Sequence, residues 1–231
     1  MRSSKWHALG NTYLLVTGAE LTPAQAVELA AGTDGIVEVR RANGEEAEVV
    51  IWNPDGSQAE LSGNGVRIAA RWLADESGAD VVRIRVGPRE VVARMLGGSE
   101  VETDLGLVAV GTPEVVAGVE LIPVDVGNPH AVVIGDPDEV TTLGPLLETH
   151  SRFPGRTNVQ VARVDGPGRV TARVWERGVG ETSASGTSAV AVAAATHDEG
   201  EVVVTFPGGD LTVRLADGRA TLIGPAERKP D

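Results

Sequence analysis

With 231 residues and a formal net charge of −13, the chain is long enough for two domains and too acidic for non-specific nucleic-acid binding, which needs clustered Lys and Arg. It has no cysteine, which excludes disulfides and thiol chemistry, and its four histidines lack metal-ligand spacing. No apolar run approaches the roughly 20 residues that span a bilayer. We therefore expect a cytoplasmic protein without a metal and with neither nucleic acid nor membrane as partner, and we leave open whether it forms a homodimer.

The first half of the chain predicts a short series of strands and helices. Thr22-Pro23-Ala24-Gln25 has the pattern of a capping box and predicts a helix that can end at Gly32. The apolar stripe after Ser62 predicts a second helix through Leu73. β-branched and apolar residues predict strands at 12–16, 36–40, 48–52, 81–86, 90–94 and 100–103.

The second half repeats this order. Strands are expected at 121–126, 131–134, 158–164, 170–175, 201–206, 211–215 and 220–223, with helices near 145–150 and after Ser185. Asn11 precedes Ser62 by 51 residues and Asn128 precedes Ser185 by 57, which supports an internal duplication. A dinucleotide-binding βαβ pattern fits less well, because no GxGxxG follows a strand. We predict two similar α+β domains, 1–113 and 114–231, with a hinge near 110–118 and a cleft between them.

Each half places a serine before its main helix. Ser62-Gly63-Asn64-Gly65 opens one helix and Ser185-Gly186-Thr187-Ser188 opens the other. Helix N-termini offer free N–H groups and the positive end of a dipole, so two of them predict two half-sites for a small molecule with a carboxylate. Acid/base groups on opposite faces of one carbon would then racemise it. Taken alone, each serine can equally be a plain N-cap.

Six motifs in chain order resemble those of diaminopimelate epimerases. They are Lys5-Trp6-His7-Ala8-Leu9-Gly10-Asn11, Asn53-Pro54-Asp55-Gly56-Ser57, Ser62-Gly63-Asn64-Gly65-Val66-Arg67, Gly127-Asn128-Pro129-His130, Asn158-Val159 and Trp175-Glu176-Arg177-Gly178-Val179-Gly180-Glu181-Thr182. The resemblance implies an isomerase that interconverts LL- and meso-diaminopimelate in lysine biosynthesis, without pyridoxal phosphate or another cofactor. It also implies two pseudo-symmetric domains, each a mixed or antiparallel, barrel-like sheet around a central helix.

The resemblance assigns roles to single residues. It places Ser62 and Ser185 at the positions of the two catalytic cysteines, and His130 near one of them. A cysteine thiol has a pKa of about 8.5, whereas a serine hydroxyl is far more basic and needs a neighbouring base. Two-thiol epimerisation should therefore be reduced or lost unless His130 or Glu176 takes over proton transfer. The implied substrate-binding residues are Asn11, Asn53, Gly63, Asn64, Asn128, His130, Asn158, Glu176, Arg177, Gly186 and Thr187.

Two other functions stay open on the sequence. One is a one-base isomerase of the phenazine-biosynthesis type, for which Glu60 is the nearest acidic candidate. The other is a catalytically impaired or non-catalytic amino-acid-binding relative that keeps the cleft. Simpler roles also remain for the site residues: Asn11 and Asn128 suit turns, and Glu176 with Arg177 suits a surface ion pair.

Overall fold

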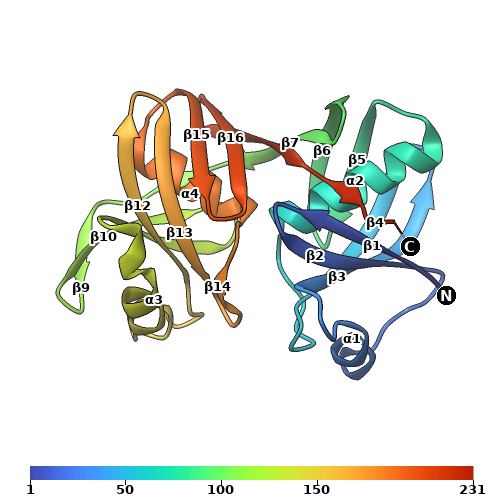
Figure 1. Cartoon of the computed structure of the whole chain (residues 1–231), viewed down its shortest axis with the longest axis horizontal. Helices are drawn as coiled ribbons and strands as arrows, with labels where there is room; N and C mark the ends of the chain where they lie inside the picture. The colour runs from blue at the N-terminus through green and yellow to red at the C-terminus, as the bar shows by residue number, and fades with distance from the viewer. Residues whose placement is uncertain (231) are drawn as a thin grey trace. The chain divides into compact units, whose positions relative to one another are not determined.

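The chain folds into two units of similar build in the computed structural model, which describes residues 1–230 (Figure 1). The first unit comprises Met1–Asp104 and the end of the chain from Ile223, and the second comprises Leu105–Leu222. This division differs from the sequence-based boundary between 113 and 114. The cause is a long-range pairing of β7 (Glu100–Leu107) with β17 (Arg219–Pro225), which returns the chain to the first unit.

The first unit is a sheet folded around one helix. Helix α2 (Gly63–Ser77) contacts all of strands β1 to β6, while the short α1 (Pro23–Leu29) connects β2 to β3. The strands are β1 (Arg2–Ala8), β2 (Asn11–Thr17), β3 (Gly35–Asn43), β4 (Glu46–Trp52), β5 (Val81–Val86), β6 (Arg89–Gly97) and the short β18 (Glu227–Arg228), which pairs with β1.

The second unit is also built around one helix. Helix α4 (Gly186–Thr196) contacts strands β10 to β13, β15 and β16, and α3 (Val140–Glu148) follows the 3-10 turn η1 (Pro137–Glu139). The strands are β8 (Ala109–Val110), β9 (Glu114–Val116), β10 (Val119–Asp125), β11 (Pro129–Ile134), β12 (Asn158–Gly166), β13 (Arg169–Glu176), β14 (Gly180–Thr182), β15 (Gly200–Phe206) and β16 (Gly209–Ala216).

Strand pairing repeats between the units. In the first, β2–β3 and β4–β5 are parallel while β3–β4 and β5–β6 are antiparallel. In the second, β11–β12 and β13–β15 are parallel while β12–β13 and β15–β16 are antiparallel. The helices fall at equivalent points of the two series. The predicted duplication and the predicted fold of two pseudo-symmetric α+β domains are therefore confirmed.

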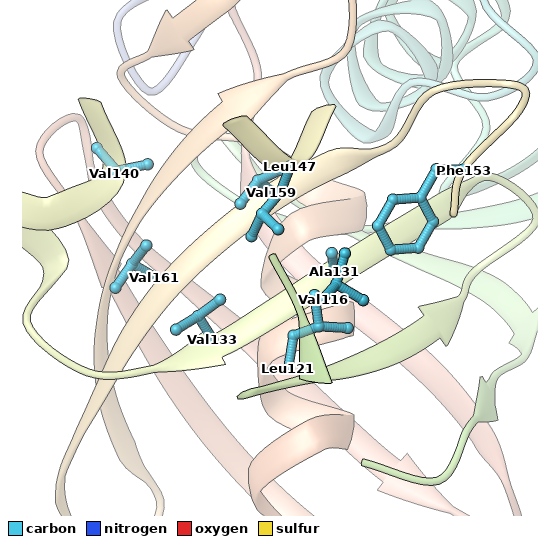
Figure 2. Packing of buried hydrophobic residues seen from close by; sticks show 9 residues of the cluster. All are labelled: Val116, Leu121, Ala131, Val133, Val140, Leu147, Phe153, Val159 and Val161. Atoms are coloured by element: carbon cyan, nitrogen blue, oxygen red, sulfur yellow. The ribbon is translucent and has the colours of Figure 1, made fainter. Parts of the chain in front are cut away.

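Both faces of the β11–β12 pair are buried, and the period-two alternation of strands decides which residues face which helix. One face packs under α3, where Figure 2 shows a hydrophobic cluster drawn from β9 to β12, α3 and the turn after it. The opposite face carries His130 and Gln160 toward α4. The members of the cluster are Val116, Leu121, Ala131, Val133, Val140, Leu147, Phe153, Val159 and Val161.

Most predicted elements occur, and the capping box of Thr22 and Gln25 is confirmed. The helix expected near 145–150 begins earlier, because Asp136 caps the preceding 3-10 turn and the helix continues through Pro145. Strand β1 was not predicted, since its first residues are polar. Within residues 1–230, no helix is long and apolar enough to cross a membrane.

Helix α3 lies close to β13 at a glycine. A Cβ added to Gly144 would stand 2.5 Å from Cγ of Trp175. Overpacking in Gly144→Ala should cost about 1–3 kcal/mol against a gain of about 1 kcal/mol in helix propensity, so we expect a net loss of stability of up to about 2 kcal/mol. Urea unfolding measures this. Gly166→Ala is the control, because nothing lies within 4 Å of its Cβ position; equal losses in the two variants would contradict the packing argument.

Candidate functional site

The first half-site is the start of α2. Ser62 has an extended backbone (φ −133°, ψ 117°) and caps the helix, its Oγ accepting from the Gly65 N–H at 3.1 Å. Tyr13 of β2 brings its hydroxyl to 3.3 Å from the same Oγ. A Cβ on Gly65 would lie 2.9 Å from Cδ1 of Ile51, so glycine lets the helix start pack closely on β4. One side of this helix start thus packs against β4, and the other side carries the hydroxyls of Ser62 and Tyr13.

A fully buried arginine fixes the rest of that helix start. Arg67 donates from Nη2 to Asn64 Oδ1 at 2.7 Å and from Nη1 to Gly63 O at 3.1 Å. Its Nε donates to Pro225 O at 3.3 Å, in the returning β17. Burial lowers the pKa of Arg67 to about 10, with opposing charge interactions from Tyr13 and Glu100, so the guanidinium remains protonated at neutral pH. It holds the Asn64 side chain and a positive charge inside the unit.

The other predicted residues of this unit lie at or beside strand ends. Asn11 is buried and begins β2, after a two-residue turn whose residues both have positive φ, 49° at Leu9 and 83° at Gly10. Asn53 follows β4 and donates from Nδ2 to Ser57 Oγ at 2.9 Å, within its own loop. Glu60, the candidate carboxylate of the one-base alternative, is exposed.

The second half-site is the start of α4. Ser185 is buried and extended (φ −142°, ψ 128°), but its side chain makes no capping hydrogen bond, unlike Ser62. Two residues on, Thr187 Oγ1 accepts from Asn128 Nδ2 at 3.4 Å. The structure therefore joins the predicted residues Asn128 and Thr187, from a hairpin and a helix 59 positions apart in the sequence.

His130 orients this pair from behind. Its Nε2 lies 2.9 Å from Asn128 Oδ1 and its Nδ1 lies 3.0 Å from Gln160 Nε2, which also donates to Ser188 Oγ at 2.9 Å. Burial lowers the pKa of His130 to about 3; the Gln160 hydrogen bond opposes this shift and the charge of Arg177 adds to it. The ring is neutral at pH 7 with both nitrogens engaged, so His130 is a positioning residue for Asn128.

The turn after β13 is tied to the same hairpin. Asn158 donates from Nδ2 to Pro129 O at 2.9 Å and accepts the Arg177 N–H at 3.0 Å. Glu176 Oε1 accepts from Thr182 Oγ1 at 2.6 Å. Three predicted residues, Asn158, Glu176 and Arg177, are thus fixed by hydrogen bonds at one end of the second unit.

A buried glutamate that the sequence motifs did not indicate anchors this turn. Glu148, at the end of α3, accepts from Trp175 Nε1 at 2.8 Å, from the Gly178 N–H at 2.7 Å and from Arg156 Nη2 at 2.5 Å. In the sequence its only signal is its spacing of four residues from Gly144, which puts both residues on one face of a helix, the face that contacts Trp175. Gln160 was missed as well, and its position opposite α4 follows only from strand register.

The described chain offers no metal centre: across residues 1–230 no group of three or more His, Asp or Glu is placed to hold an ion. The chemistry available is that of hydroxyls, amides, a buried guanidinium and two helix N-termini. These groups can bind a polar ligand and move a proton. Such a set suits an acid/base isomerase.

Several solved structures share this fold. A protein described as a predicted epimerase from Pseudomonas aeruginosa aligns over 99% of this chain and 97% of its own, with a TM-score of 0.78 and 18% identity. A hydroxyproline epimerase from Agrobacterium vitis aligns with a TM-score of 0.70, 14% identity and coverages of 99% and 90%. A phenazine biosynthesis protein of the PhzF family from Bacillus anthracis reaches 0.75 at 12% identity, covering 99% and 96%.

Sequence comparison shows the family. The family model of diaminopimelate epimerase matches residues 122–229. The diaminopimelate epimerase of Synechocystis is 35% identical across 97% of this chain and 95% of its own length, and that of Desulforudis audaxviator is 35% identical across 98% and 96%. The chain belongs to the diaminopimelate epimerase family, a family of isomerases.

Glu148→Gln tests the anchor of the turn. An amide nitrogen cannot accept a hydrogen bond, so either the Trp175 indole loses its partner, or the Gly178 N–H and the Arg156 guanidinium lose theirs. We expect a stability loss of about 1–3 kcal/mol, with faster hydrogen exchange at the Gly178 amide or at the Trp175 indole. Glu201→Gln, in an exposed ion pair with Arg214, is the control and should change neither stability nor exchange. Unchanged stability, with unchanged exchange at both groups, would show that Glu148 does not hold the turn.

The burial of His130 predicts how the stability of the protein depends on pH. Its folded pKa of about 3 lies below the ordinary 6.5, so between these values the unfolded chain takes up a proton that the folded protein does not. The free energy of unfolding therefore has its full value, as far as His130 is concerned, above pH 6.5. Below pH 6.5 it falls by up to about 1.4 kcal/mol per pH unit. His130→Gln should flatten this part of the stability–pH curve. His150→Gln, outside the core, serves as control, and parallel curves for wild type and His130→Gln would refute the prediction.

Proposed function

We propose that the protein interconverts LL- and meso-diaminopimelate by removing the α-proton and returning one from the opposite face. The observation that carries this proposal is the 35% identity to diaminopimelate epimerases across nearly the whole chain. The six motifs quoted above support it, because they cover the start of α2, the hairpins that carry Asn11 and Asn128, and the turn after β13. The same relatives support a place in lysine biosynthesis, and we propose a cytoplasmic location.

Proton transfer needs a group for each face of the α-carbon. We assign these roles to Ser62 in the first unit and Ser185 in the second. Main-chain N–H groups at the starts of α2 and α4 are suited to a carboxylate, whose charge grows as the carbanion forms. The scheme needs no pyridoxal phosphate, since hydroxyls carry the proton and helix ends stabilise the charge.

Substrate recognition falls to the amides and the charged turn. Asn64, held by Arg67, and Asn128, held by His130, present fixed amide groups beside the two helix starts. Glu176 and Arg177 suit the ammonium and carboxylate of an amino acid. Because Asn64 and Asn128 are positioned by buried partners, little side-chain entropy remains to be lost on binding.

The alternatives are less well supported. A one-base mechanism would need a carboxylate at the helix start, and Glu60 is exposed on the loop before it. An impaired relative that only binds amino acids remains a direct competitor, because serine is a poorer proton carrier than a thiol at neutral pH. Hydrogen exchange at the substrate α-carbon separates this binding-only relative from an active epimerase.

Purified protein incubated with diaminopimelate in D₂O should incorporate deuterium at the α-carbon. The double variant Ser62→Cys with Ser185→Cys should raise the exchange rate by about 10²–10⁴-fold, the usual contribution of a well-matched acid/base group. Ser151→Cys, in the exposed turn after α3, introduces a thiol elsewhere and should give no increase. Absence of exchange in the wild type would exclude the proposed function, and exchange in the double variant alone would indicate an impaired relative whose site is otherwise intact.

A further inference from the structure

Tyr13 and His130 occupy matching places in the two units. Each lies two residues after an asparagine at the first hairpin, Asn11 in one unit and Asn128 in the other. Each strand, β2 or β11, then pairs in parallel with the next, β3 or β12. Because side chains two apart share a face of a strand, each ring lies on the same side as its asparagine, toward the central helix. The pseudo-repeat therefore aims one aromatic ring at each helix start.

The two rings have different partners. His130 bonds two amides, whereas the Tyr13 hydroxyl lies 3.3 Å from Ser62 Oγ. The Gly65 N–H already donates to that oxygen at 3.1 Å, so the hydroxyl hydrogen of Ser62 can be donated to Tyr13. Only the first half-site thus couples its serine to a second titratable hydroxyl.

The ring of Tyr13 is fixed by its neighbours. It is 8% exposed and faces Gly35 of β3, where an added Cβ would lie 2.7 Å from Tyr13 Cε1 and 2.8 Å from Trp52 O. Glycine at this position makes room for the ring, and the surrounding backbone leaves it little freedom to turn. The phenol is therefore held toward Ser62.

A buried cation acts on the phenol. The buried guanidinium of Arg67 interacts electrostatically with Tyr13. A phenol ionises near pH 10, far below a serine hydroxyl, and a neighbouring cation stabilises the phenolate further. Of the two hydroxyls, Tyr13 is the one that can reach the anionic state.

We infer that Tyr13 positions the Ser62 hydroxyl and accepts its proton. The two hydroxyls together then take the place of a single thiol in the first half-site. The inference rests on the proposed function. Ser62 Oγ takes the α-proton while its own hydroxyl proton passes to the Tyr13 phenolate. The C–H bond and the original serine O–H bond break, two O–H bonds form, and the electron pair stays on the α-carbon. The reverse step returns the proton.

Tyr13→Phe keeps the ring and removes only the hydroxyl. We expect the rate of α-deuterium exchange to fall about 10²-fold, with the affinity for diaminopimelate in calorimetry unchanged. In the background of Ser62→Cys and Ser185→Cys, the same substitution should cost less than about tenfold, because a thiolate needs no relay. Equal losses in the two backgrounds would indicate a purely structural role and overturn the inference.

A substrate-free measurement tests the pair directly. Tyr13 is the only tyrosine in the chain, so the near-ultraviolet absorbance of phenolate reports it alone. Ser62→Ala removes the donated hydrogen bond and should raise the pH at which the phenol ionises. Ser77→Ala, at the far end of α2, is the control. Identical titrations of wild type and Ser62→Ala would overturn the inference.

The outcomes separate this inference from the proposed function. Wild-type exchange that survives Tyr13→Phe overturns the inference alone. Exchange seen only in the double cysteine variant overturns the relay and leaves the substrate assignment standing. Absence of exchange in both proteins overturns the proposed function and the relay together.

Discussion

A helix that starts inside a folded sheet must find partners for its first N–H groups and for the positive end of its dipole. Both units of this protein are built under that constraint. The start of α2 meets it with the Ser62 cap, a glycine that allows close packing, and Arg67 bonded to Gly63 and Asn64. The polar groups that make a candidate active site are thus the same groups that allow the helix to be buried.

The two units satisfy the constraint by different means. The first buries a charge, Arg67, and keeps a pair of hydroxyls beside it. The second uses neutral groups: Gln160, His130 and Asn128 form a chain of hydrogen bonds that reaches Thr187. Buried polar groups without partners are costly, so the loss of one member of either arrangement destabilises the members that bond to it. A duplicated fold has therefore produced two half-sites of unequal chemistry.

The sequence predicted what local patterns determine: the repeat, the main helices, most strands and the residues at the helix starts. It could not predict the pairing of β7 with β17, which joins distant segments and shifts the domain boundary. Glu148 and Gln160 were missed because their roles depend on helix face and strand register. His130 stood in a motif that suggested proton transfer, yet complete burial makes it neutral. Sequence motifs thus indicated candidate residues, and packing decides which groups each of them contacts.

The hydrogen bond from Arg67 to Pro225 joins residues 158 positions apart. The helix start of the first unit, with Asn64 held by the same arginine, therefore needs a segment that is translated after the whole of the second unit. The second unit has all of its own residues by Leu222. The first unit, although its synthesis starts earlier, is consequently completed later than the second.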